Sequence, residues 1–210
     1  KLNATLTNLN QETAGYINGF NSYKNENLSK LNFNPDAYRD ANSQKISISI
    51  SQIEDNILTS VTPYLRLNDM NFLQHYLPGT PMEKNSHIST GLIMQQIIEY
   101  DTFNVIKGIQ VDLAKSEIMQ IQKNNLTTSS AFNNATRPKG KHYDYKVNSS
   151  VFALFLGIEE YFLNDRLNAF ADVRAEFIEY DYSNNMLSGN TKEDGSKCGF
   201  GGCYYNRPSD

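Results

Sequence analysis

The sequence predicts an all-β protein, an antiparallel meander of about seven long strands with the proportions of a transmembrane β-barrel wall. Three observations support this fold class. Long segments alternate apolar and polar residues, long connections alternate with tight turns, and aromatic residues flank the ends of the segments. No run of about 18 apolar residues occurs, which excludes a transmembrane helix but not a transmembrane strand.

The clearest pattern is a hairpin over residues 147–182, turning around Leu163, Asn164 and Asp165. A two-residue turn pairs even positions of the first arm with odd positions of the second. One face is then wholly apolar, with Phe152, Leu154, Leu156 and Ile158 beside Leu167, Ala169, Ala171, Val173, Ala175 and Phe177. The other face carries Asp172, Arg174 and Glu176, which we interpret as a cross-strand charge ladder in a wet interior. Each arm has about 14 to 16 residues, which exceeds ordinary strands and favours a membrane barrel.

The remaining strands are shorter patterns of the same kind. They begin with the alternation of Leu2, Ala4 and Leu6 and continue at residues 45–52, 57–68, 87–99 and 103–122. Long connections are expected at residues 8–43, 69–86, 126–141 and 183–210. All of them fall at the same end of the meander, as the external loops of outer-membrane barrels do.

Aromatic residues lie at both ends of the strands. Tyr100, Phe103, Tyr161 and Phe162 flank short turns, whereas HYDYK (142–146) and EYDYS (179–183) lie at the opposite end. We interpret them as the two interfacial girdles of a membrane barrel. The alternative is that Tyr and Phe are simply good strand formers.

Composition excludes some functions and indicates a compartment. The net charge of −4 provides no basic surface for nucleic acid. Cys198 and Cys203, in CGFGGC, predict a disulfide in an oxidising compartment; half of a metal site or two free thiols are the alternatives. The chain begins within an alternating pattern (KLNATLTNLN) and ends within a loop (NRPSD), so we expect it to be part of a longer protein.

Four segments carry a resemblance to a known family. They are NQETAGYINGF (10–20), NPDAYRDA (34–41), VTPYLRLNDMNFLQHYLPG (61–79) and EYDYSNNMLSGNTKEDGSKCGFGGCYYNRP (179–208). In this order they resemble the barrel portion of TonB-dependent outer-membrane receptors. The resemblance spans most of the chain and gives one domain, residues 1–210, as part of a receptor barrel. No plug domain, TonB-contacting segment or closing C-terminal strand is recognised.

The resemblance implies a roughly 22-strand transmembrane β-barrel in the bacterial outer membrane. It implies active uptake of a ferric chelate of the siderophore type, driven by the TonB complex through the missing plug domain. Outer-membrane lipid and lipopolysaccharide would surround the barrel. We expect no cofactor, metal site or nucleic-acid partner. A saccharide or other small nutrient is the alternative cargo, and a soluble secreted β-sandwich for binding or adhesion is the alternative fold and function.

The sequence shows no basis for catalysis, because it contains no HExxH, GxSxG, P-loop or GxGxxG motif. Ligand contacts are instead expected on the long loops, which a rigid scaffold would hold. The candidates combine rings with cations, a chemistry that suits planar or anionic chelates: Tyr16, Phe20, Tyr23, Tyr38, Arg39, His75, Tyr76, Arg137 and His142. Arg137 and His142, together with Lys139 and Lys141, form a basic cluster; it would attract an anionic chelate, contact lipopolysaccharide phosphates or simply be solvated.

Overall fold

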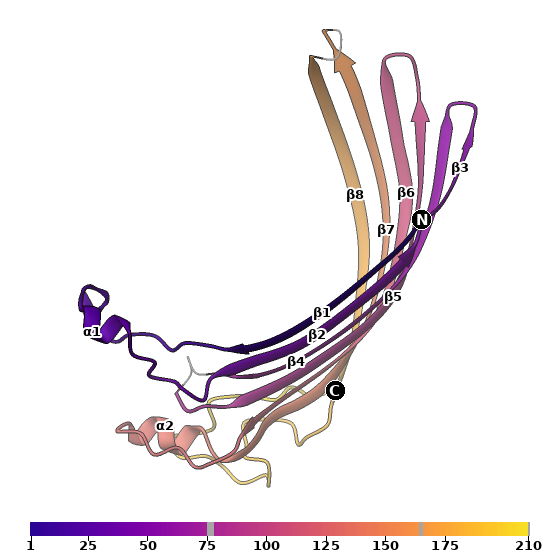
Figure 1. Cartoon of the computed structure of the whole chain (residues 1–210). Coiled ribbons are helices and arrows are strands. Elements are labelled where there is room, and N and C mark those ends of the chain that lie inside the picture. Colours follow the sequence, from indigo (N-terminus) through magenta and orange to yellow (C-terminus); the bar gives the residue numbers. More distant parts are fainter. Residues whose placement is uncertain (75–77, 164–165, 210) are drawn as a thin grey trace.

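The computed structural model describes residues 1–74, 78–163 and 166–209. The chain forms one curved antiparallel sheet with a few short helical segments at one end (Figure 1). The strands are β1 (Leu2–Glu12), β2 (Tyr38–Ile48), β3 (Ile50–Glu54), β4 (Ile57–Leu73), β5 (Met82–Glu99), β6 (Phe103–Gln122), β7 (Gly140–Phe162) and β8 (Leu167–Asn184). The helical segments are η1 (Ser22–Lys24), α1 (Glu26–Ser29) and α2 (Ala131–Thr136).

The sheet follows the order of the chain, which confirms the predicted meander. Its order is β1-β2-β4-β5-β6-β7-β8, and β3 extends the line of β2 along β4. The break between β2 and β3 lies at Ser49, whose backbone N–H donates to Lys1 O at 2.8 Å. Eight strands therefore replace the expected seven. In the described part of the chain the sheet is not closed, and β1 and β8 are its two edges.

Several strands extend further toward the long connections than the sequence pattern predicted. The bounds of β6 agree with the prediction, but β1 continues to Glu12, β2 begins at Tyr38 and β5 begins at Met82. These extensions contain polar residues on both faces, so they show no alternation. Their backbones nevertheless pair with neighbouring strands without interruption. Long connections lie at one end of the sheet and short turns at the other (Figure 1).

The register separates the two faces of the sheet as predicted for the last hairpin. Phe152 pairs with Phe177 and Leu156 with Val173, so the paired numbers have an odd sum. The turn residues Asn164 and Asp165 lie outside the described residues. We call the face that carries Phe152, Leu156, Val173 and Phe177 the apolar face, and the opposite one the polar face.

The apolar face contains a continuous apolar belt. The belt covers residues 57–67 of β4, 88–98 of β5, 103–113 of β6, 152–162 of β7 and 167–177 of β8. Of the 30 side chains that these segments place on this face, 25 are apolar. The five exceptions are Thr59, Thr90, Gln96, Lys107 and Glu160.

The belt is exposed, because no second layer of the described chain covers it. Leu154 is 50% exposed and Val173 is 63% exposed. A soluble sandwich would bury such residues beneath a second sheet. The buried cluster of hydrophobic residues lies elsewhere, around Cys198, Cys203 and Tyr205 in the segment after β8.

Candidate functional site

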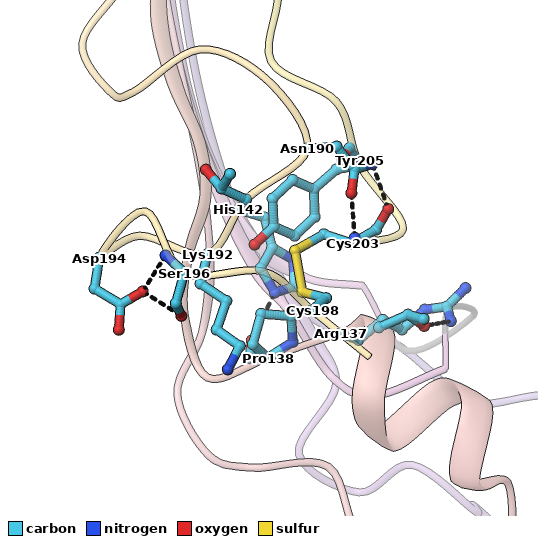
Figure 2. Close-up of a disulfide and its surroundings, with 12 residues drawn as sticks. Arg137, Pro138, His142, Asn190, Lys192, Asp194, Ser196, Cys198, Cys203 and Tyr205 are labelled. Atoms are coloured by element: carbon cyan, nitrogen blue, oxygen red, sulfur yellow. Dashed lines mark hydrogen bonds between the residues drawn. A yellow bond between two sulfur atoms is a disulfide. The ribbon is translucent and has the colours of Figure 1, made fainter. Parts of the chain in front are cut away.

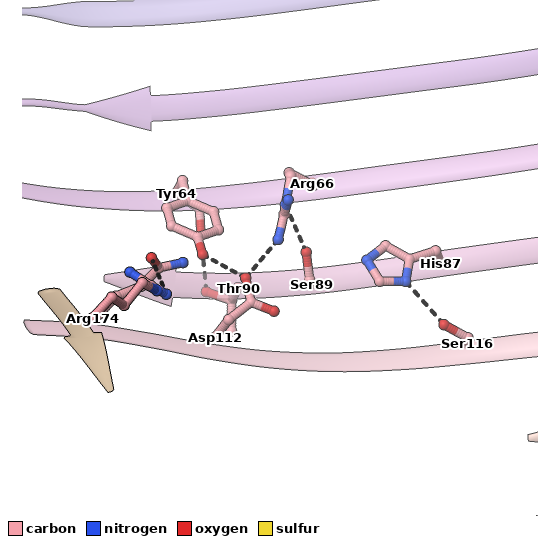
Figure 3. A network of polar contacts seen from close by, with 9 residues as sticks. Tyr64, Arg66, His87, Ser89, Thr90, Asp112, Ser116 and Arg174 are labelled. Carbon is pink, nitrogen blue, oxygen red and sulfur yellow. Dashed lines mark hydrogen bonds and ion pairs between the residues drawn. The ribbon is translucent and has the colours of Figure 1, made fainter. Parts of the chain in front are cut away.

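The polar face carries a hydrogen-bonded network at its centre (Figure 3). Asp112 on β6 accepts from Tyr64 Oη and from Arg66 Nη2 of β4, each at 2.5 Å. Arg66 also donates from Nε to Ser89 Oγ at 2.9 Å. The network therefore spans β4, β5 and β6, and it leaves part of the Arg66 side chain exposed beside a largely buried Asp112.

A glycine allows Tyr64 to reach across the strand between it and Asp112. Tyr64 pairs directly with Gly91, which in turn pairs with Asp112. A Cβ atom on Gly91 would lie 2.4 Å from the Tyr64 ring. The ring therefore lies flat over the glycine, as only a residue without a side chain permits. Phe155 covers its paired residue Gly108 in the same manner.

A second network lies on the same face near the long connections. Glu83 accepts from Tyr143 Oη at 2.6 Å and from Gln74 Nε2 at 2.5 Å. Gln120 Nε2 donates to both Gln74 Oε1 and Tyr143 Oη. Burial, together with the neighbouring carboxylate of Glu83, raises the pKa of Tyr143 far above its usual value. Tyr143 is thus a neutral hydrogen-bond donor at this site.

The tyrosines of HYDYK and EYDYS lie on the polar face, which corrects the prediction of an interfacial girdle at this end. Tyr143 and Tyr145 are odd-numbered residues of β7, whereas the belt uses the even-numbered ones. Tyr180 and Tyr182 of β8 likewise share the face of Arg174. The rings of Tyr145 and Tyr182 lie 5.4 Å apart. At the short-turn end, Phe103 and Phe162 do lie on the apolar face, but Tyr161 does not.

The segment after β8 is held by the predicted disulfide and by one buried arginine. Cys198 and Cys203 are joined, as the spacing CGFGGC predicted. Arg207, only 2% exposed, donates to Leu187 O, Thr191 Oγ1 and Lys192 O, and to His142 O of β7. Tyr205 stacks on His142 with ring centroids 4.6 Å apart (Figure 2). These contacts fasten the segment to the beginning of β7.

The candidate ligand residues of the first long connection remain exposed. Tyr16, Phe20 and Tyr23 are respectively 54%, 97% and 70% exposed. They lie near η1 and α1, which project away from the sheet (Figure 1). Tyr38 and Arg39 belong instead to β2, so their assignment to a loop was wrong. The Arg39 guanidinium lies 5.6 Å from the ring of Phe72.

The basic cluster of the third long connection is largely occupied by internal contacts. Arg137 lies over the Tyr204 ring at 4.1 Å, and Lys141 Nζ forms a 2.6 Å ion pair with Asp144. His142 is buried, with Nδ1 2.9 Å from Gln120 Oε1 and Nε2 2.8 Å from Pro138 O. Burial, with the positive charges of Arg137 and Arg207, holds the pKa of His142 below its usual value. His142 therefore lies beneath the surface rather than in a ligand-binding loop.

Two other sequence predictions have partial outcomes. His75 and Tyr76 lie outside the described residues. The charge ladder on β8 is a different arrangement from the one predicted, because Arg174 bonds Glu176 of its own strand. Arg174 also reaches over β7 to Gln110 Oε1 on β6, at 3.1 Å.

Sequence reasoning missed the two networks of the polar face. Gly91 and Gly108 interrupt otherwise regular strands, and an isolated glycine inside a strand signals a close approach of another group. That signal would have marked Gly91 as a point of close approach, but it identifies neither Tyr64 nor Asp112, because both depend on the register of the strands. Glu83 lay within a predicted loop, so its pairing with Tyr143 had no sequence signal.

Comparison of the chain with protein-family models, curated proteins and solved structures finds no match. Within the described ranges, no three His, Cys, Asp or Glu side chains are grouped so that they could hold a metal ion. None of the helices in the described part of the chain is long and apolar enough to cross a membrane.

Proposed function

We propose that this chain forms part of the wall of an outer-membrane β-barrel, and that the barrel is a TonB-dependent receptor that imports a ferric chelate. The apolar belt carries the proposal. It occupies 11 residues on each of five strands, from β4 to β8. Transmembrane strands require about 9–11 residues.

The dimensions of the belt fit a bilayer. The long-connection end of the belt is Leu67 on β4 and Phe177 on β8. In the strand pairing, however, Phe177 lies level with Pro63, through Leu92, Val111 and Phe152. The end of the belt is therefore offset by four residues between β4 and β8. Four residues of about 3.4 Å over four strand spacings of about 4.8 Å correspond to a tilt of roughly 35°. Membrane barrels have strands tilted by about 35–45°. At that tilt, the ten steps of each belt segment rise about 28 Å, close to the hydrocarbon thickness of about 30 Å.

The opposite face has the composition of a wet interior. At the depth of the belt it carries Tyr64, Arg66, Asp112, Arg174 and Glu176, linked by hydrogen bonds. Polar lumens and lipid-facing apolar belts are the rule in outer-membrane barrels. The soluble sandwich loses support, because no second layer of the described chain packs on the belt.

The transport function is supported by the family resemblance and by the long connections gathered at one end of the sheet (Figure 1). The exposed rings of Tyr16, Phe20 and Tyr23 remain available to a ligand there. A ferric chelate is proposed as the cargo because the family resemblance implies it. A saccharide is the second candidate, favoured by Tyr145 and Tyr182 on the polar face, since tyrosine rings stack well on sugars.

Growth of a strain that lacks the full-length protein would test the proposal. We expect slow growth in iron-limited medium supplied with ferric chelates, rescue by the wild-type gene, and the same defect in a strain without TonB. Normal growth under iron limitation with loss of growth on one sugar would favour the saccharide instead. Rescue that persists without TonB would contradict TonB-dependent transport.

A further inference from the structure

One row of polar side chains interrupts the apolar belt. Thr59 on β4 pairs with Gln96 on β5, which pairs with Lys107 on β6. The other two exceptions have simpler explanations. Thr90 donates to the backbone oxygen of Tyr64 at 3.2 Å, and Glu160 lies at the short-turn limit of the belt. The row of Thr59, Gln96 and Lys107 therefore remains to be explained.

Lys107 has no neutralising partner among the described residues. Within the described ranges no carboxylate forms an ion pair with its ammonium group, and the side chain is exposed on the apolar face. Lys115, on the same strand and face but beyond the belt, forms a 3.2 Å ion pair with Glu117. A cation among lipid-facing residues is costly unless an anion or water reaches it.

The row of Thr59, Gln96 and Lys107 contains hydrogen-bond donors that are available to a bound group. Gln96 Nε2 donates to Thr59 Oγ1 at 3.1 Å, and within the described residues the Thr59 hydroxyl proton and the second Gln96 N–H have no acceptor. Lys107 adds the three donors of its ammonium group. Three adjacent strands thus present donors and one positive charge, which suits a phosphate oxygen.

A hollow adjoins the row and continues into the belt. Its volume is about 420 Å³, within the range of small-molecule sites. Its apolar lining includes Met94, Ile109 and Leu154, beside the polar Thr59, Gln96 and Lys107. The site therefore combines a phosphate-binding row with an apolar surface that suits an acyl chain.

Lys107 lies near the middle of the belt, one residue to the short-turn side of the centre of the β6 segment. Lys107 lies four residues from Phe103, the short-turn limit of the belt on β6. That separation corresponds to about 11 Å of depth at the tilt of roughly 35°. Lysine side chains extend along apolar surface toward the interface, and local thinning of the bilayer around a deep cation brings the phosphates of that leaflet toward the ammonium group.

We propose that Thr59, Gln96 and Lys107 form a binding site for the phosphate of a glycerophospholipid in the leaflet on the short-turn side. This rests on the proposed location of the belt in a membrane. The lipid's phosphate accepts from Lys107 and its neighbours, and one acyl chain lies along Met94, Ile109 and Leu154. The site is non-covalent and selects for a phosphate-bearing lipid.

Native mass spectrometry of the full-length protein, released from micelles containing palmitoyl-oleoyl phosphatidylglycerol, tests the site. We expect one retained lipid in wild type and in Lys107→Arg. Lys107→Leu should lower the retained fraction about tenfold, because a charge-assisted hydrogen bond is lost. Lys115→Leu is the matched control and should retain the lipid. Diacylglycerol, which lacks the phosphate, and inorganic phosphate, which lacks the acyl chains, should not be retained.

Equal retention by wild type and Lys107→Leu would overturn the site, as would an equal loss in Lys115→Leu. Retention of inorganic phosphate alone would overturn the assignment to a lipid. Insertion into bilayers is measured in parallel. A protein that inserts but retains no lipid refutes this site and leaves the barrel standing, whereas failure to insert refutes the barrel and the site together.

Discussion

Aromatic side chains on the polar face lie over glycines of the neighbouring strand, and this arrangement positions the central network. Tyr64 covers Gly91 and reaches Asp112, two strands away from its own. Phe155 covers Gly108. Each glycine lowers the intrinsic stability of its strand, but its lack of a side chain allows a large ring to lie flat against the sheet. At the residue scale, the absence of a side chain therefore determines where its neighbours point.

Substitution of Gly91 tests this arrangement. In Gly91→Ala, the new Cβ atom would lie 2.4 Å from the Tyr64 ring, and the ring must leave Asp112. We expect a loss of about 1–3 kcal/mol in the free energy of unfolding, typical of overpacking. Denaturant titration of the membrane-inserted protein measures it. Gly157→Ala is the control, because its Cβ atom would meet nothing closer than 3.6 Å; an equal loss there would contradict the explanation.

Asp144 provides a test that depends on pH. Burial alone would raise its pKa, but hydrogen bonds from Lys141 and Asn185 outweigh this and hold the pKa below the usual 3.8. Its stabilising effect is therefore present above pH 3.8 and is lost as the pH falls through the lower pKa of the folded state. Because Lys141 is partly exposed, we expect only about 0.5–1 kcal/mol.

The measurement compares thermal unfolding of wild type and Asp144→Asn across pH. The wild type should be more stable at neutral pH, and the two curves should converge in acid. Asp181→Asn is the control, since Asp181 forms no ion pair within the described ranges. A constant difference at all pH values would exclude the charge of Asp144 as the cause.

At the element scale, the segment after β8 depends on Arg207. The side chain crosses from this segment to β7 and donates to three carbonyl oxygens and one hydroxyl. Such a group holds together backbone that has little regular structure of its own. The disulfide closes only a short loop within the same segment, so it limits the segment's own freedom but does not attach it to the sheet.

Arg207→Met should detach the segment while leaving β7 and β8 paired. Four acceptors lose their donor, of which His142 O is buried and the others are partly buried, so we expect a local loss of about 3 kcal/mol. Hydrogen exchange at Gly189, whose N–H donates to Arg207 O, should accelerate accordingly. Exchange in the centre of β7 should not change. Lys197→Met, at an exposed position of the same segment, should leave Gly189 protected.

At the scale of the whole molecule, the opposite character of the two faces defines the protein. Adjacent residues of one strand project into different surroundings, so neighbouring substitutions should have very different effects. Leu92 and Ile93 lie at the centre of the belt segment of β5, Leu92 on the apolar face and Ile93 on the polar face.

Leu92→Arg should therefore prevent or weaken insertion into lipid, with a cost of about 2–4 kcal/mol at mid-depth. Ile93→Arg should be tolerated better, because its side chain faces the polar side beside Gln110. Folding into vesicles, measured by resistance to added protease, distinguishes the two. Equal effects of both substitutions would show that the two faces are in the same environment, and would remove the support for a membrane barrel.

The alternation of residues alone determined the strand character, the two faces of the last hairpin and the alternation of long connections with short turns. These are local properties, because side chains along a strand alternate with period two and a turn sets the parity of pairing. The spacing of Cys198 and Cys203 likewise predicted their bond.

Only the tertiary structure decided the rest. The polar ends of β1, β2 and β5 have no alternation, so their extent depends on pairing with neighbouring strands. The burial of His142 depends on Tyr205 and Arg207, more than 60 residues away. The offset of the apolar belt, from which the tilt follows, exists only once five strands are placed in register. Such features arise from contacts between residues far apart in the chain, and a pattern of period two contains no information about which distant partner each strand meets.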